Sequence, residues 1–333
     1  MPSLLSDHPQ IDNLLGDPQR PADPLLSLVV PVYNEAATIR PFLATVQPTL
    51  EHLALRYEIL FINDGSHDDT LQQLLTAICD DPRLRCLNLS RNFGKEAALT
   101  AGIEHASGDL VVPMDVDLQD PPELIAEFIV KWREGYDVVY GIRQDRSSDT
   151  TTKRATAGWF YRIFNHLSPV SIPENAGDYR LIDRRVVEAL RQFPERNRFM
   201  KGLFAWVGFH AIGIPYTRQQ RQLGQSKFSY WKLWNFAIDG ITSFSSAPLR
   251  IWTYIGTLIA GLAFLYALFI VTRVLLTGVD MPGYASLMTV ILFLGGVQLM
   301  SLGILGEFIG RLFTEVKARP LYLVEGIYQR RQP

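Results

Sequence analysis

Three carboxylates and an amide are concentrated in one short stretch of the sequence, residues 114–120. The preceding segment, 109–113, is apolar and predicts a buried strand, and the prolines that follow the acidic stretch predict the start of a helix. The acidic groups therefore follow the carboxyl end of a strand, where open α/β sheets bind their ligands. Carboxylates and amides are the oxygen ligands that Mg2+ or Mn2+ prefers, and such a metal binds a diphosphate. This pattern indicates a metal site at the acidic stretch, and a solvated acidic turn is the alternative interpretation.

Apolar runs that predict strands alternate with amphipathic segments that predict helices. The predicted strands are 25–32, 57–62, 84–89, 109–113 and 138–142, and the predicted helices are 38–53, 66–79, 96–106 and 124–132. We expect Ser66 to cap the second of these helices, with Asp68 and Asp69 in its first turn. Strands that alternate with helices form a mostly parallel sheet with right-handed crossovers. The sequence therefore predicts an α/β domain.

Aromatic, acidic and basic residues also follow the first three predicted strands. These residues are Tyr33 and Glu35, then Asp64, then Arg91 and Lys95. The carboxyl ends of parallel strands lie on one edge of the sheet, so a single site built from separate segments explains the set. Polar loops explain any one strand end but explain the whole set poorly. No Gly-x-Gly-x-x-Gly follows the first strand and no Gly-x4-Gly-Lys-Ser/Thr occurs, so dinucleotide dehydrogenases and P-loop enzymes are not indicated.

Four segments, in order and spacing, resemble the inverting family 2 glycosyltransferases of the GT-A fold. They are Pro-Val-Tyr-Asn-Glu at 31–35, Asn-Asp-Gly-Ser at 63–66, Arg-Asn-Phe-Gly-Lys at 91–95 and Asp-Val-Asp-Leu-Gln-Asp-Pro-Pro at 115–122. The resemblance is to the branch that acts on polyprenyl phosphates, which includes dolichyl-phosphate mannose synthase and the GtrB-type undecaprenyl-phosphate glucosyltransferases. It covers about residues 25–325. It implies a GT-A domain, a nucleotide-sugar donor, a Mg2+ or Mn2+ cofactor and a lipid phosphate acceptor.

The resemblance also implies roles for individual residues. Those expected to bind the nucleotide sugar are Pro31, Tyr33, Glu35, Asp64, Lys95 and Asp115. Those expected to face the metal and diphosphate are Asp117, Gln119 and Asp115. The segment Asp-Tyr-Arg-Leu at 178–181 is similar to the family's Asp-Phe-Arg-Leu, which marks Asp178 as a catalytic residue beside Asp117. An acid that caps the helix predicted over 184–191 would be Asp183 rather than Asp178.

The expected role of Asp178 depends on the protonation of the acceptor. A lipid monophosphate has its second pKa near 6, so at neutral pH it is largely a dianion and already a nucleophile. Little proton abstraction is then required. Asp178 is expected to act either as a base or by positioning the acceptor for in-line attack.

A basic segment near residue 221 is the candidate acceptor site. Arg221, Gly224, Ser226 and Lys227 resemble the family's Arg-x-x-Gly-x-Ser-Lys. Two cations around a glycine suit a phosphate, by charge and by close approach of the backbone. We expect Arg221, Ser226 and Lys227 to bind the acceptor phosphate together with Arg154. A basic segment beside the membrane and a solvated basic helix face are the alternatives.

The hydrophobic residues are concentrated near the C-terminus. Segments 251–276 and 285–310 predict two transmembrane helices, since about 26 residues span roughly 39 Å and the hydrocarbon layer is roughly 30 Å thick. The aromatic segment 228–247 predicts an amphipathic helix at the membrane surface, with a core helix as the alternative. The loop between the spans has no Lys or Arg, whereas the flanking segments are basic. The positive-inside rule then places both termini and the catalytic domain in the cytoplasm. The resemblance to the GtrB type implies a bacterial inner membrane.

The remaining segments complete the expected domain organisation. It comprises a flexible extension over 1–24, the catalytic domain over 25–227, the membrane segments and a cytoplasmic tail over 311–333. The chain has 333 residues and a net charge of −2, so its charge gives no reason to expect nucleic-acid binding. Its two cysteines, Cys79 and Cys86, are expected to be buried thiols.

The expected function follows from the motifs and the membrane segments together. We expect transfer of a single glucose from UDP-glucose to undecaprenyl phosphate with inversion at the anomeric carbon, in a protein that forms a homotetramer by resemblance to the GtrB type. GDP-mannose or another UDP-sugar as donor is the alternative within this reaction. A non-catalytic membrane scaffold is the alternative from another class. A processive polysaccharide synthase is not indicated, because no Gln-x-x-Arg-Trp segment occurs.

Overall fold

The computed structural model describes residues 20–144, 173, 176–196, 198–217, 247–277 and 283–330. Several predictions concern residues outside these ranges. They are the roles of Arg154, Arg221, Ser226 and Lys227, nearly all of the extension 1–24, and residues 228–246 of the amphipathic helix.

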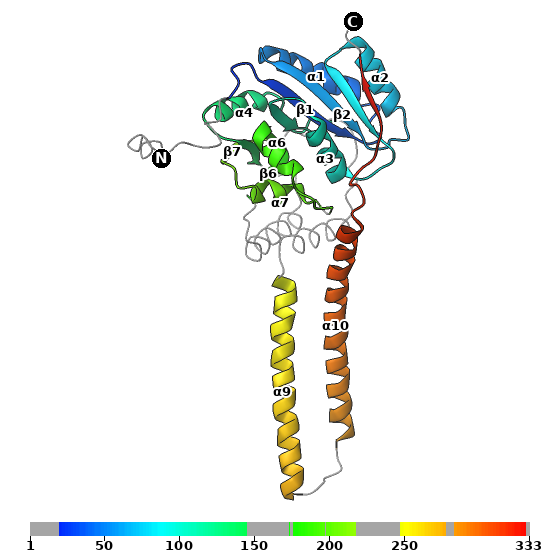
Figure 1. Cartoon of the computed structure of the whole chain (residues 1–333), viewed down its shortest axis with the longest axis vertical. Coiled ribbons are helices and arrows are strands. Elements are labelled where there is room, and N and C mark those ends of the chain that lie inside the picture. Colours follow the sequence, from blue (N-terminus) through cyan, green and yellow to red (C-terminus); the bar gives the residue numbers. More distant parts are fainter. Residues whose placement is uncertain are drawn as a thin grey trace, which may run out of the picture.

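Among the described residues, an eight-stranded sheet in the order β7-β5-β6-β4-β1-β2-β3-β8 forms the centre of the catalytic domain (Figure 1). The strands are β1 Leu25–Val32, β2 Arg56–Asn63, β3 Leu84–Leu89, β4 Leu110–Pro113, β5 Val138–Arg143, β6 Ala176–Asp183, β7 Ala211–Tyr216 and β8 Val324–Gln329. The inner strands β4, β1, β2 and β3 are parallel, with Leu28 opposite both Ile59 and Val112. Strands β6 and β8 are antiparallel to their neighbours β4 and β3. The carboxyl ends of the parallel strands therefore share one edge, as the sequence predicts.

Helices cover both faces of the sheet, which is why its central strands β4, β1, β2 and β3 are buried over most of their length. The helices of the catalytic domain are α1 Ile39–His52, α2 Thr70–Asp80, α3 Lys95–His105, α4 Leu124–Arg133, α6 Arg184–Arg191 and α7 Met200–Trp206. On one face, Phe42 of α1 and Phe128 of α4 pack in the same core as Leu28 of β1. On the other face, Leu99 of α3 packs with Val29 of β1. Consecutive residues of β1 thus point into different cores, as the two-residue period of a strand requires.

Two long helices extend from the catalytic domain and lie side by side, α9 Ala247–Thr277 and α10 Tyr284–Lys317 (Figure 1). Within the described part of the chain, one segment is long and apolar enough to cross a membrane, Phe293–Lys317. It begins and ends later than the predicted second span, 285–310. In α9 the apolar segment is Tyr254–Tyr266, which is shorter than the length required of a membrane span.

After α10, the chain returns to the catalytic sheet. Ala318 ends the helix in the left-handed conformation, with φ of 48°. Residues 324–329 then pair antiparallel with β3, with Tyr328 opposite Cys86. The sequence analysis predicts no strand in this segment, so the expected tail contains both the end of α10 and the last strand of the sheet.

Two local expectations are wrong. Helix α2 begins at Thr70, and Ser66 does not cap it; its hydroxyl instead accepts a hydrogen bond of 2.9 Å from the Asn34 backbone N–H. Residues 66–68 hold the loop after β2 against the loop after β1, so the helix starts after them. Cys86 is buried as expected, but Cys79 lies exposed on α2. The expected cap Asp183 is confirmed, since its carboxylate accepts from the Arg185 N–H at the start of α6.

Candidate active site

The loops that follow β1 and β2 are tied together by side-chain to backbone hydrogen bonds. Asn34 lies in the left-handed region at φ of 53°, and its side-chain oxygen accepts from the His67 N–H at 2.9 Å. The Glu35 N–H donates to the Thr70 hydroxyl at 2.8 Å. Tyr33 lies half-buried in the same loop. Two predicted donor-binding residues, Tyr33 and Glu35, therefore lie on a loop whose backbone is held by the next strand end.

Asp64 connects the loop after β2 to the loop after β3. It is 4% exposed, and its two carboxylate oxygens accept from the Phe93 N–H at 2.7 Å and the Gly94 N–H at 3.0 Å. Burial raises the pKa of Asp64, and these hydrogen bonds oppose the rise. A β-carbon at Gly65 would collide with the Arg91 backbone, so the two loops are in close contact. Asp64 thus holds the 91–95 loop by accepting hydrogen bonds from its backbone. It is also a candidate residue for binding the sugar donor.

Lys95, at the start of α3, lies between two carboxylates from different strands. Its ammonium group is 2.7 Å from Asp115 after β4 and 3.1 Å from Asp178 on β6. Burial opposes its charge, but these two carboxylates outweigh burial and raise the pKa of Lys95. The structure therefore brings together three predicted site residues from different segments. Asp178 follows Asp115 by 63 positions in the sequence. One cation neutralises part of the charge of two acids that would otherwise repel each other.

Asp178 has an oxygen that is suited to a ligand. Its Oδ1 atom is buried and has no hydrogen-bond partner in the described structure. Burial alone would raise the pKa of Asp178, but the positive charges of Lys95, Lys201 and Arg180 hold it well below its ordinary value. Asp178 is therefore ionised at neutral pH. A buried acceptor without a partner is uncommon and calls for a donor, which a substrate can supply.

Glu96, next to Lys95 in α3, is a second acid in this region. Burial and the charge of Asp178 raise its pKa to about 7. Its carboxylate accepts a hydrogen bond of 3.2 Å from the Met200 N–H at the start of α7. The two acids thus have pKa values shifted in opposite directions, which is typical of functional sites.

The turn after β4 presents Asp117 and Gln119. The Asp117 carboxylate accepts from the Gln119 N–H at 3.2 Å, and Leu118 between them has φ of 54°. Asp120 is buried and accepts a hydrogen bond of 2.5 Å from the Tyr216 hydroxyl. This hydrogen bond between Asp120 and β7 stabilises the turn. Asp117 and Gln119 follow Asp115 closely in the same turn, at the edge of the sheet.

The oxygen donors of this turn fit a divalent cation by their chemistry. Asp115, Asp117 and Gln119 supply hard oxygen atoms, but Asp115 is already paired with Lys95. Among the described residues, no group of three or more His, Cys, Asp or Glu side chains is arranged to hold a metal ion by itself. Mg2+ commonly takes one or two carboxylates and completes its shell with phosphate oxygens and water. The turn is therefore suited to a metal that arrives with a diphosphate.

Three residues near Asp178 were missed by the sequence analysis. The Arg180 guanidinium lies 4.0 Å from the centre of the Phe204 ring and donates to the Gly177 carbonyl at 2.7 Å. Lys201 adds positive charge from α7, and Glu96 follows Lys95 directly. The position of Glu96 next to a predicted site residue was a usable signal. Lys201 lies in a segment without a recognisable motif, so only the fold reveals it.

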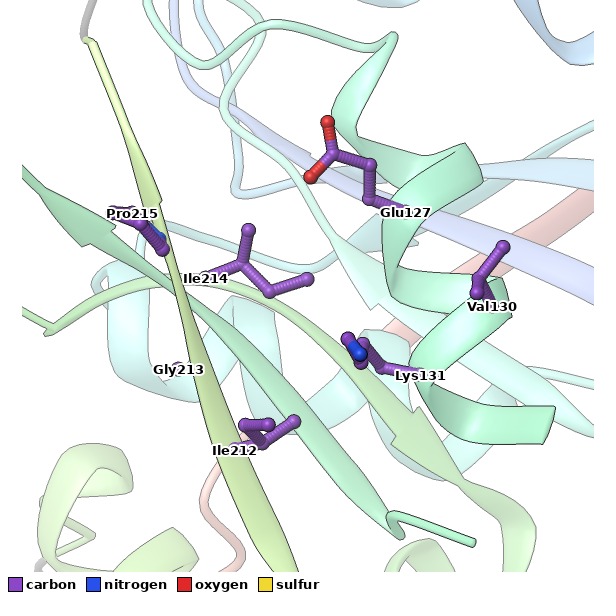
Figure 2. Close-up of a pocket in the computed structure, with 7 residues that line it drawn as sticks. All are labelled: Glu127, Val130, Lys131, Ile212, Gly213, Ile214 and Pro215. Atoms are coloured by element: carbon purple, nitrogen blue, oxygen red, sulfur yellow. The ribbon is translucent and has the colours of Figure 1, made fainter. Parts of the chain in front are cut away.

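A shallow apolar pocket of about 280 Å³ lies between α4 and β7 (Figure 2). Its lining consists of Glu127, Val130, Lys131, Ile212, Gly213, Ile214 and Pro215. None of these is a predicted site residue, and the side chains from α4 and β7 face each other across the pocket (Figure 2). The pocket is separate from the cluster formed by Lys95, Asp115 and Asp178.

Comparison with known proteins identifies the family of the chain. Residues 27–191 match glycosyl transferase family 2, and residues 247–312 match the GtrB C-terminal hairpin. The SfII prophage-derived bactoprenol glucosyl transferase of Shigella flexneri is 51% identical over 300 residues, which are 90% of this chain and 97% of that protein. The chain belongs to the family 2 glycosyl transferases. As a member of this family it is an enzyme, and the predicted α/β GT-A fold with a mostly parallel sheet is confirmed.

Other relatives of this glycosyl transferase match over a similar length. An uncharacterized glycosyltransferase of Synechocystis is 53% identical over 303 residues, which are 91% of this chain and 95% of that protein. The prophage bactoprenol glucosyl transferase homolog of Escherichia coli K12 is 49% identical over 302 residues, 91% of this chain and 99% of that protein. The similarity thus includes both the catalytic domain and the two long helices.

Proposed function

We propose that this glycosyl transferase moves one glucose from UDP-glucose to undecaprenyl phosphate and inverts the anomeric centre. The observation that carries the proposal is the 51% identity to a bactoprenol glucosyl transferase over 90% of the chain, which includes the match to the GtrB C-terminal hairpin. Bactoprenol is undecaprenol, so its phosphate is the expected acceptor. The product would be undecaprenyl-phosphate glucose with UDP as the leaving group.

In the proposed reaction an oxygen of the acceptor phosphate attacks carbon 1 of glucose while the bond from carbon 1 to the UDP oxygen breaks. Attack from the face opposite to the leaving group inverts this carbon. The acceptor is largely a dianion at neutral pH, since its second pKa is about 6. The pKa of Asp178 lies below its ordinary value, so Asp178 is a weak base. We therefore assign Asp178 a positioning role, with its unpaired Oδ1 accepting a hydrogen bond from a sugar hydroxyl.

Donor binding is assigned to residues at the carboxyl ends of β1, β2, β3 and β4. These residues are Pro31, Tyr33, Glu35, Asp64, Lys95 and Asp115. Tyr33 provides an aromatic face for a nucleobase, and Lys95 provides a positive charge paired with both Asp178 and Asp115. Support for this arrangement comes from the hydrogen bonds that hold the three loops together.

A Mg2+ or Mn2+ ion is part of the proposal. Asp117 would hold it, with Gln119 and Asp115 beside it, and the donor diphosphate would complete the shell. When bound, the metal neutralises the charge that develops on the leaving diphosphate. The hard oxygen donors of the turn after β4 support this assignment.

Membrane attachment is proposed through α9 and α10, which would form a two-helix anchor in a bacterial inner membrane. The apolar segment Phe293–Lys317 and the match to the GtrB C-terminal hairpin support it. The positive-inside rule places the catalytic domain in the cytoplasm, where nucleotide sugars are made. Arg154, Arg221, Ser226 and Lys227 are proposed to bind the acceptor phosphate, and the protein is proposed to form a homotetramer.

The deciding experiment measures radiolabelled sugar that enters the lipid phase. Purified protein is incubated with undecaprenyl phosphate, Mg2+ or Mn2+, and either UDP-glucose or GDP-mannose. We expect label from UDP-glucose in the lipid. If only GDP-mannose labels the lipid, the assignment of UDP-glucose as donor is wrong but the reaction class is kept. If soluble sugars are extended and the lipid is not labelled, the assignment of undecaprenyl phosphate as acceptor is wrong.

A further inference from the structure

The last strand of the sheet carries an irregularity at Glu325. Asn88 of β3 pairs with Gly326, but the next residue, Leu89, pairs with Val324, so Glu325 is an extra residue with no partner of its own. Such a bulge changes the direction in which a side chain points, and bulges are common next to active sites. Here the Glu325 carboxylate accepts a hydrogen bond of 2.8 Å from the Asn88 side-chain amide.

From Asn88 the hydrogen bonds continue toward the site. Asn88 is 5% exposed, and its side-chain oxygen accepts a bond of 2.7 Å from the Asn63 amide. Asn63 is 1% exposed, and its oxygen accepts from the Ser66 N–H at 3.3 Å. The Ser66 hydroxyl in turn accepts from the Asn34 N–H at 2.9 Å. A chain of side chains thus connects β8 to the two loops assigned to donor binding.

The direction of these bonds is set at both ends, because the Ser66 N–H can only donate and an ionised Glu325 carboxylate can only accept. An ionised carboxylate can only accept, so Asn88 must turn its NH2 group toward Glu325 and its oxygen toward Asn63. Asn63 must then turn its NH2 group toward Asn88, which leaves its oxygen for the Ser66 N–H. An exposed carboxylate on β8 and the Ser66 N–H therefore favour the same orientation of the two buried amides, and the second amide holds the loop that contains Asp64.

We infer that Glu325 is a positioning residue for the nucleotide-sugar donor, acting through Asn88 and Asn63 on the loop 63–66. This inference rests on the proposed function for the assignment of the loop to the donor. It gives β8 a role beyond closing the edge of the sheet. The strand follows α10 directly in the chain, so the segment that returns from the proposed membrane anchor also orders the donor site.

The test uses three substitutions that differ in hydrogen-bonding capacity at the exposed position 325. Glu325→Gln retains an acceptor and should keep the donor KM within about twofold of wild type. Glu325→Ala removes the acceptor and should raise the donor KM about fivefold. Glu325→Lys can only donate, so it sets an ammonium group against the Asn88 NH2 group, and turning Asn88 and Asn63 around would place an NH2 group against the Ser66 N–H. It should therefore raise the donor KM about tenfold or more, with kcat and the KM for undecaprenyl phosphate unchanged.

The full-length enzyme is assayed with UDP-glucose, or with GDP-mannose if that donor labels the lipid, so a wrong donor assignment does not affect the result. Gln329→Lys, an exposed residue of β8 opposite Arg85, controls for a positive charge on the strand. Thermal unfolding of each variant is measured in parallel. A graded rise in donor KM in the order Gln, Ala, Lys supports the inference. Unchanged donor KM, equal changes in both substrate KM values, or a loss of stability alone would overturn it.

Discussion

The Lys95 ammonium group lies 3.1 Å from the Asp178 carboxylate, although the two residues come from the start of α3 and from β6. The same ammonium group lies 2.7 Å from Asp115. Lys95 therefore connects the strand end that is proposed to face the diphosphate with the acid that is proposed to face the reacting sugar. Asp115 pairs with this cation directly, and Asp178 is compensated by it together with Lys201 and Arg180.

Replacement of this cation should lower turnover. Lys95→Met leaves Asp115 and Asp178 to repel each other and removes a positive charge near the leaving diphosphate, so we expect kcat to fall about 100-fold. Initial rates with saturating donor and acceptor measure the effect. Lys131→Met, an exposed lysine of α4 paired with Glu134, is the matched control. Equal rates for Lys95→Met and wild type would show that the ion pairs have only a structural role.

The metal assignment predicts loss of activity in Asp117→Asn. The substitution keeps the size of the side chain but removes the charge proposed to bind the cation, so turnover should be abolished while the protein stays folded and membrane-bound. Activity is titrated with Mg2+ and with Mn2+, and Mn2+ binding in the presence of UDP is measured by electron paramagnetic resonance. Asp80→Asn, an exposed acid of α2, serves as the control. Near wild-type activity in Asp117→Asn would refute the assignment.

Glu96 should make stability depend on pH. Its pKa is about 7 in the folded protein, and an unfolded glutamate has a pKa of about 4.3. The folded state therefore binds more protons between these values, so the contribution of Glu96 to stability is present below about pH 4.3 and is lost as the pH rises through about 7. Glu96→Gln keeps the acceptor for the Met200 N–H but has no charge to bury.

We therefore expect Glu96→Gln to have a higher Tm than wild type at pH 8 and a smaller advantage at pH 5. Asp178, with its pKa below the ordinary value, gains and loses protons below this range, so it does not obscure the comparison. Thermal unfolding in one detergent at several pH values provides the measurement. A Tm difference that is the same at pH 5 and pH 8 would exclude Glu96 as the titrating group.

The proposed topology can be tested by labelling with a membrane-impermeant thiol reagent. The exposed Cys79 is first replaced in Cys79→Ser, because it would react as well. In this background Gly278→Cys, which lies between α9 and α10 in the sequence, should be labelled from the periplasmic side. Gln329→Cys on β8 should be labelled only after the membrane is opened. The reverse pattern would overturn the orientation and with it access to cytoplasmic nucleotide sugars.

The acceptor assignment predicts a selective effect of Arg221→Ala. If this cation binds the lipid phosphate, its loss should raise the KM for undecaprenyl phosphate about tenfold or more and should leave the donor KM nearly unchanged. Steady-state kinetics with each substrate varied in turn separate the two effects. A larger rise in donor KM would move Arg221 to the diphosphate side of the site.

The strand and helix pattern up to residue 143 was predictable, because apolar runs and amphipathic segments there alternate without interruption. The start of α2 was not predictable from local rules. Ser66 is a favourable capping residue, but a hydrogen bond to Asn34 on a different loop uses its hydroxyl. Tertiary contacts of this kind compete with local capping, and sequence spacing does not reveal them.

Residues 324–329 show a second limit of sequence reasoning. They form a strand only because β3 offers an unpaired edge, and their sequence, Val-Glu-Gly-Ile-Tyr-Gln, is too short and too polar to stand out. Within the candidate site, the motifs predicted which segments contribute but not how they interact. The arrangement of the strands determines these interactions. It pairs Lys95 with Asp178, and it lets the Asp64 carboxylate accept hydrogen bonds from backbone N–H groups.

The position of β8 at the end of the chain affects the order of events during synthesis. A ribosome completes β1 to β7 and then both long helices before it reaches residue 329, so the outer edge of β3 lacks its partner throughout that time. Unpaired strand edges favour aggregation and wrong pairing. Insertion of α9 and α10 during translation would hold each nascent molecule at the membrane, apart from its neighbours in solution, while that edge is open. The catalytic sheet then closes only after the proposed anchor, α9 and α10, has been made.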